Sequence, residues 1–105
     1  MKSLMTTLIA TGLLAAGSAC AADMPDVAKK NNCTTCHAID KKQVGPAWKD
    51  VADKYRGDKK ASATLFTKIS KGGSGVWGST AMPASSPNVS DADIKALVKF
   101  ILALK

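Results

Sequence analysis

The residues with the clearest chemistry are Cys33, Cys36 and His37, in the segment Cys-Thr-Thr-Cys-His. A Cys-x-x-Cys-His run is typical of the covalent attachment site of a c-type haem. Each of the two thiols, three residues apart on a tight helical turn, can form a thioether to one vinyl group of the porphyrin, and the imidazole that follows then faces the iron. His37 is the one histidine of the 105-residue chain, so no second imidazole competes for the iron.

Three other kinds of site use similar residues and fit the sequence less well. A thioredoxin-like redox pair belongs to a βαβ pattern, and no such pattern is visible. A zinc site requires four ligands, whereas the chain has no Cys or His after His37. A structural disulfide between Cys33 and Cys36 would leave the adjacent imidazole without a role. The pattern therefore favours haem attachment.

The N-terminal segment indicates export. A positive charge at Lys2 precedes an apolar run over residues 4–16, and small residues follow, which is the pattern of a cleavable secretory signal. We expect cleavage after Ala22 or Ala21. Residues 1–22 are then the signal peptide, and residues 23–105 form one domain in the periplasm.

Two other roles of the same segment are considered. The apolar run is too short and wrongly flanked to span a bilayer. A lipoprotein in which Cys20 is retained and lipidated is the second alternative. Gly17 argues against it, because an apolar residue such as Leu is usual at that place in the lipoprotein motif.

The expected elements are helices. No stretch alternates with period two for long enough to suggest a strand. Apolar spacing and capping residues predict helices in four places: from Asp23 or Met24 up to the haem motif, over residues 47–55, from a cap at Ser62 to the glycines at 72–75, and after Ser90. Residues 72–89 hold many glycines and prolines and are expected to be irregular.

The last of these helices is the best bounded. Ser90 is a good N-cap, and Asp91 and Asp93 lie in the first turn, where the helix dipole favours anions. Its apolar residues recur at intervals of three and four: Ile94, Leu97, Val98, Ile101 and Leu102. We expect this helix to pack across the first one and to close the haem pocket.

A methionine is best placed to supply the sixth iron ligand. Two of the four methionines belong to the expected signal and Met24 lies at the mature terminus, which leaves Met82, in the glycine- and proline-rich loop. A thioether favours ferrous iron, so His/Met ligation raises the reduction potential and suits a one-electron carrier. We expect the carbonyl of Pro46 to accept the second ring N–H of His37 and to fix its tautomer.

The mature segment resembles the small bacterial class I cytochromes c of the c-551/c-552 (cytochrome c8) group, found with denitrifying and ammonia-oxidising respiratory chains. The resemblance covers essentially all of that segment. It rests on VAKKNNCTTCH at 27–37, VGPAWKDVA at 44–52, GVWG at 75–78, MP at 82–83 and NVSDAD at 88–93. It implies an all-α class I cytochrome c fold, with four to five helices and loops wrapped around one covalently bound haem c.

The resemblance also implies roles for single residues. The family's thioether cysteines match Cys33 and Cys36, and its axial ligands match His37 and Met82. By the same resemblance, three further residues belong to the haem environment. Pro46 accepts from the histidine ring, Trp77 hydrogen-bonds a haem propionate, and Lys68 lies near that propionate. The chain departs from the family in residues 84–87, which intervene where members often continue Met-Pro-Pro-Asn into the last helix.

These features predict a periplasmic monohaem electron carrier and not an enzyme. It would transfer one electron by an outer-sphere step, with both axial ligands kept, between respiratory or denitrification complexes. One alternative is a haem domain with a labile sixth ligand, which binds small molecules or reacts with peroxide. Another is a haem domain that acts as a fixed subunit of a larger oxidase or reductase.

The net charge of +7 bears on the partners. Lysines that ring an exposed haem edge can steer a negatively charged redox protein into contact. The expected partners are acidic surfaces of a cytochrome bc1-type complex, a terminal reductase or oxidase, or a peroxidase. Contact with membrane complexes is expected to be transient only. The chain itself is expected to be a monomer. Nucleic acid is not expected as a target, because the chain is exported and lacks a basic helix with base-reading residues.

Overall fold

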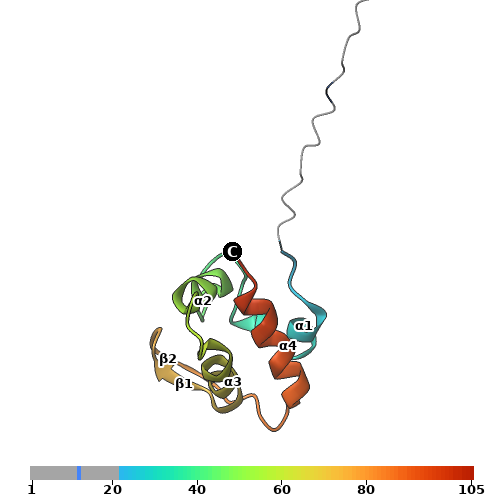
Figure 1. Ribbon diagram of the computed structural model, residues 1–105. Helices are drawn as coiled ribbons and strands as arrows, with labels where there is room; N and C mark the ends of the chain where they lie inside the picture. Colours follow the sequence, from blue (N-terminus) through green and yellow to red (C-terminus); the bar gives the residue numbers. More distant parts are fainter. Residues whose placement is uncertain (1–11, 13–21) are drawn as a thin grey trace, which may run out of the picture.

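The computed structural model describes Gly12 and residues 22–105, so the expected signal peptide lies almost wholly outside the described residues. The described elements follow one another along the chain (Figure 1) as α1 (Asp26–Lys30), the 3-10 turn η1 (Cys33–Thr35), α2 (Trp48–Tyr55), α3 (Ala61–Lys71), β1 (Gly73–Gly75), β2 (Gly78–Met82) and α4 (Asp91–Leu102). No helix in this described part of the chain is long and apolar enough to cross a membrane.

Helix α4 organises the core. Its N-terminus is capped as expected, since the backbone N–H of Asp93 donates to Ser90 Oγ over 3.2 Å. Ile94 and Leu97 are its most deeply buried side chains. The helix packs against α1, α2 and α3 (Figure 1), so the predicted crossing of the last helix over the first is confirmed.

Two helix starts differ from those expected. Helix α3 begins at Ala61 with Lys60 as its N-cap, so Ser62 lies within the helix and does not cap it. The start is earlier because Asp58 accepts from the backbone N–H of Lys60 over 2.8 Å, which turns the chain into the helix. Helix α1 begins at Asp26, after the expected start at residue 23 or 24.

Residues 72–89 are more regular than expected. Strands β1 and β2 pair antiparallel, with Gly73 opposite Met82 and Gly75 opposite Gly78. The expectation that no strands form is wrong for these two segments. They escaped prediction because both strands are short and almost fully exposed, so they have no buried face and no apolar alternation. Glycines at positive φ, +104° at Gly75 and +106° at Gly78, flank the turn between the two strands.

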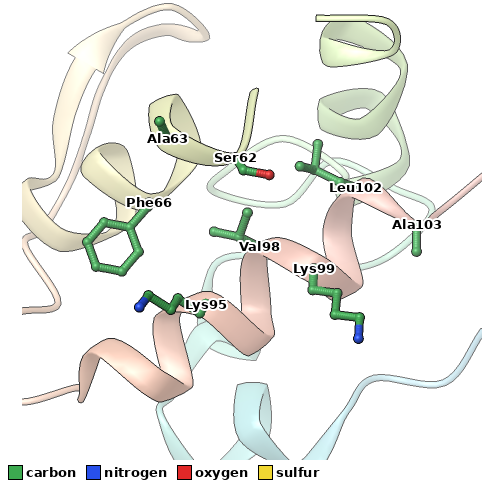
Figure 2. Close-up of a pocket in the computed structure, with 8 residues that line it drawn as sticks. All are labelled: Ser62, Ala63, Phe66, Lys95, Val98, Lys99, Leu102 and Ala103. Atoms are coloured by element: carbon green, nitrogen blue, oxygen red, sulfur yellow. The ribbon is translucent and has the colours of Figure 1, made fainter. Parts of the chain in front are cut away.

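Side chains of helices α3 and α4 line two different cavities. One face of the pair borders an open groove (Figure 2), lined by Ser62, Ala63, Phe66, Lys95, Val98, Lys99, Leu102 and Ala103. Other side chains of the same two helices face a second cavity: Leu65, Ile69, Leu97 and Ile101. The two helices therefore form a wall whose inner face belongs to the site described next.

Candidate haem site

A cavity of about 530 Å³ opens between the motif turn, the hairpin and the inner faces of α3 and α4. Its lining includes every site residue expected from the sequence: Cys33, Cys36, His37, Pro46, Lys68, Trp77 and Met82. These residues come from segments far apart in the chain, and the packing of α1, α2 and α3 on α4, with the hairpin following α3, brings them to one cavity.

The motif turn holds both thiols and the imidazole close together. The backbone N–H groups of Cys36 and His37 both donate to the carbonyl of Cys33, over 3.2 Å and 3.0 Å. Asn32 enters the turn in the left-handed region, with φ 60°. Both cysteines are half-buried and are not joined to each other. Burial raises the pKa of the Cys33 thiol.

The orientation of His37 is set by the loop that follows it. Its ring Nδ1 lies 2.9 Å from the carbonyl oxygen of Pro46, and because a carbonyl oxygen only accepts, Nδ1 carries the hydrogen. In the tautomer with this hydrogen, the lone pair is on Nε2, which is the atom that is then available to a metal. The indole of Trp48 packs nearby, with the two ring centroids 5.8 Å apart.

Gly45 lies directly against the same ring. A Cβ atom at this position would lie 2.5 Å from His37 Cε1 and 2.9 Å from Nδ1. The backbone N–H of Gly45 donates to the carbonyl of Cys36 over 2.8 Å, so the loop is also fixed to the motif turn. No side chain fits between this loop and the ring, and this explains why glycine is suited to the position.

Met82 lines the cavity from the hairpin. It is the last residue of β2, is half-buried and packs against the hydrophobic core. Lys68, on α3, is also half-buried and lines the same cavity. Trp77, in the hairpin turn, is 42% exposed, and the Lys54 ammonium lies 5.7 Å from its ring centroid. Such a cation–π contact links α2 to the hairpin.

A link between α1 and α4 was missed in the sequence. The side-chain amide of Asn31 donates to Asp93 Oδ2 over 3.2 Å and to the carbonyl of Val27 over 2.8 Å. The Lys30 ammonium lies 3.1 Å from the same Asp93 oxygen. The hydrogen bond from Asn31, and then that from Lys30, lower the pKa of the Asp93 carboxyl. No pattern in a single sequence pairs residues 31 and 93, which come together only through helix packing.

The cavity suits a covalently attached haem. Its volume lies within the range of about 300–1,000 Å³ that is typical of cofactor sites. Apolar side chains of α3 and α4 form one wall, two thiols lie on the motif turn, and an imidazole nitrogen and a thioether are both available to iron. The hydrogen bond at Nδ1 of His37 leaves its other nitrogen free for that role.

Comparison with known proteins gives a consistent result. The family model for cytochrome c matches residues 21–105. Cytochrome c-552 of Nitrosomonas europaea is 54% identical over 99 residues, which cover 94% of this chain and 93% of that protein. Cytochrome c-551 of Pseudomonas aeruginosa is 45% identical over 101 residues, covering 96% and 95%. The crystal structure of wild-type Nitrosomonas europaea cytochrome c552 matches with a TM-score of 0.73 and 55% identity, over 76% of this chain and 98% of that one.

Proposed function

Because the chain belongs to the cytochrome c family, we propose that it is a periplasmic carrier of single electrons between respiratory or denitrification complexes. The fold is that of the class I cytochromes c, and the family carries one covalently attached haem c. When bound, this group supplies an iron that changes between Fe²⁺ and Fe³⁺. The proposal assigns the thioethers to Cys33 and Cys36, and the two axial positions to His37 and Met82.

The hydrogen bond between His37 and Pro46 carries the assignment of the first axial ligand. With Nδ1 donating over 2.9 Å to the carbonyl, the imidazole is held in one tautomer and one orientation, with Nε2 free. A metal-binding histidine typically has such a partner, which increases its basicity as a ligand. His37 thereby binds without a conformational change, which a carrier with fixed ligands requires.

Met82 supports the carrier function from the other side. Its thioether is a soft donor that favours the reduced metal and raises the reduction potential. The apolar side chains of Leu65, Ile69 and Leu97 exclude water from the cavity and disfavour the additional charge of the oxidised state. With both axial ligands kept, no bond of a substrate is made or broken, and the step is an outer-sphere transfer.

The surface around the cavity supports acidic redox partners. Lys68 lines the cavity together with Lys30, whose ammonium also lies 3.1 Å from Asp93. The exposed apolar side chains of Val44, Val76 and Trp77 line it as well. Lysines of this kind steer an acidic protein toward the opening, and the apolar side chains then allow close contact. The proposed partners are acidic surfaces of respiratory or denitrification complexes. The proposal includes cleavage of residues 1–22 as a signal peptide, so the protein would meet surfaces of these complexes that face the periplasm.

Optical spectra of the mature protein, expressed in the periplasm, test the proposal. The oxidised form should show a far-red methionine-to-iron band, the haem should stay attached in denaturant, and carbon monoxide should not change the spectrum of the reduced form. Covalent haem without that band, and with ready carbon monoxide binding, would support instead a haem protein with a labile sixth ligand. Absence of attached haem would contradict the proposal altogether.

The variant Met82→Ala tests the second axial ligand. The haem should remain attached, the far-red band should disappear, and the reduced protein should bind carbon monoxide. Met24→Ala is the matched control, because Met24 is also half-buried against the core but does not line the cavity. It should behave like the parent protein. A Met82→Ala protein that keeps the band and excludes carbon monoxide would show that another group occupies the position.

A further inference from the structure

The segment that carries Met82 is attached to the C-terminal end of α3 through its backbone. The N–H of Ser85 donates to the carbonyl of Ile69 over 3.0 Å, and the N–H of Ser86 donates to the carbonyl of Ser70 over 3.2 Å. The accepting carbonyls belong to the last turns of α3, which have no partners further along the helix. The hairpin adds a second attachment on the other side, since Gly73 pairs with Met82.

Gly72 lies between these two attachments. It ends α3, with φ +70° and ψ −160°, and its N–H donates to the carbonyl of Lys68 over 2.7 Å. This backbone conformation is essentially restricted to glycine. A Cβ atom at Gly72 would collide with the carbonyl oxygen of Met82 and lie 2.8 Å from both Ala84 N and the Pro83 carbonyl carbon.

The three atoms that a Cβ at Gly72 would meet all belong to the backbone. Backbone atoms cannot rotate away as the end of a side chain does. Because the loop is attached on both sides, at Gly73 and at Ser85, an added methyl group would shift the whole stretch that includes Met82. A shift away from α3 changes the point from which the thioether enters the cavity.

We propose that Gly72 is a positioning residue for the second axial ligand. Its missing side chain lets the backbone of residues 82–84 approach the end of α3 closely enough for the Met82 sulfur to face the iron. This inference rests on the proposed His/Met ligation and adds a residue to it. The motif turn, Pro46 and the thioether cysteines lie outside the segment that would move, so haem attachment should not depend on Gly72.

The test compares Gly72→Ala with Gly57→Ala in the haem-loaded protein. Gly57 also has a positive φ, of +82°, but a Cβ atom there would meet nothing within 4 Å. Both substitutions therefore strain the backbone, and only the first displaces the loop. The far-red band and carbon monoxide affinity report on Met82, whereas thermal unfolding reports on general destabilisation.

Gly72→Ala should retain covalent haem, lose most of the far-red band and bind carbon monoxide at concentrations that leave the spectrum of the reduced parent unchanged. Gly57→Ala should keep the parental band and exclude carbon monoxide, even if its unfolding temperature falls. A Gly72→Ala protein that matches Gly57→Ala in both measurements would overturn the inference. Failure of the ligand proposal itself is separate: the Met82→Ala protein would then resemble the parent.

Ser85→Pro keeps the inference testable if Gly72→Ala gives no folded protein. Proline lacks the N–H that Ser85 donates to Ile69, and the change leaves α3 itself intact. A partial loss of the far-red band and a smaller gain in carbon monoxide affinity are expected. A full band with no carbon monoxide binding in Ser85→Pro would count against positioning of Met82 by its attachment to α3.

Discussion

The two sides of the cavity hold their candidate iron ligands in different ways. The side chain of His37 is oriented by its own hydrogen bond, which ring Nδ1 donates to the carbonyl oxygen of Pro46. The motif turn fixes the backbone of the same residue. Met82 is positioned through its backbone, by strand pairing with Gly73 and by the attachment of its loop to α3. The first ligand therefore depends on a local contact and the second on the path of a whole segment.

The two sides also differ in how they join the core. The motif turn follows α1, which packs against α4 and is linked to it by Asn31 and Asp93. The hairpin is almost fully exposed and reaches the core mainly through Met82. Changes in the core should therefore affect the His37 side through stability, whereas changes in the hairpin should affect ligation with little loss of stability.

Ile94→Ala should have the largest effect on stability. The Ile94 side chain is 0% exposed, so its truncation should lower the free energy of unfolding by about 2–5 kcal/mol. The far-red band of the protein that remains folded should be unchanged, because the hairpin does not depend on this contact. Denaturant titration followed by the haem spectrum measures both quantities. Lys95→Ala, at the next residue, which is exposed, is the control. Its free energy of unfolding should stay within about 0.5 kcal/mol of that of the parent.

A selective loss of the far-red band in Ile94→Ala, at full stability, would remove the contrast between the two sides.

Gly45→Ala should disturb the His37 side directly. The added methyl group would lie 2.5 Å from His37 Cε1, and the ring cannot move away without losing its bond to Pro46. Overpacking of this kind costs about 1–3 kcal/mol of stability. Chemical unfolding measures the loss, and the yield of haem-attached protein should fall with it.

The comparison with Gly72→Ala sharpens the contrast, since that variant should change ligation more than stability. Equal effects of the two glycine variants on both readouts would mean that the cavity responds as one unit.

Asp93→Asn should give the smallest and the most pH-dependent effect. The folded protein lowers the pKa of this carboxyl, chiefly through Asn31, so ionised Asp93 stabilises the fold at pH values above the ordinary value of about 3.9. That contribution is lost as the pH falls through the lowered pKa. The variant should therefore unfold at a lower temperature than the parent at neutral pH, and the difference should vanish in acid.

Thermal unfolding at the two pH values measures this difference, with Asp91→Asn as control. Asp91 shares the first turn of α4 and its dipole but not the contacts with α1. A deficit of equal size in both variants would assign the effect to the helix dipole and not to the link.

Helix α4 shows how far a single sequence can predict this fold. Its cap at Ser90 and its apolar periodicity are local properties, and the structure has the helix where they place it. The residues of the candidate site were also indicated by the sequence, because the haem motif is contiguous and Met82 follows a conspicuous group of glycines. The start of α3 was missed because Asp58, and not Ser62, organises its first turn.

The contact between His37 and Pro46 was expected from the sequence, whereas the close approaches at two glycines were not. Gly45 and Gly72 are two of eight glycines, and their close approaches to His37 and to the Met82 backbone exist only in the folded chain. The strands β1 and β2 have no buried face to produce a pattern. The sequence therefore indicated the candidate haem-binding residues and one partner of His37, whereas the backbone approaches at Gly45 and Gly72 are visible only in the tertiary structure.

The order of α4 after the candidate site residues has a consequence for synthesis. All the candidate site residues, from Cys33 to Met82, precede it, and yet α4 supplies Ile94, Leu97 and Ile101 to the core and packs against every other α-helix of the described chain. A premature stop codon after Ser90 would give a polypeptide that has all the candidate haem-binding residues but lacks the helix against which the other helices pack. The reactive residues are thus translated before the segment that lets them act together.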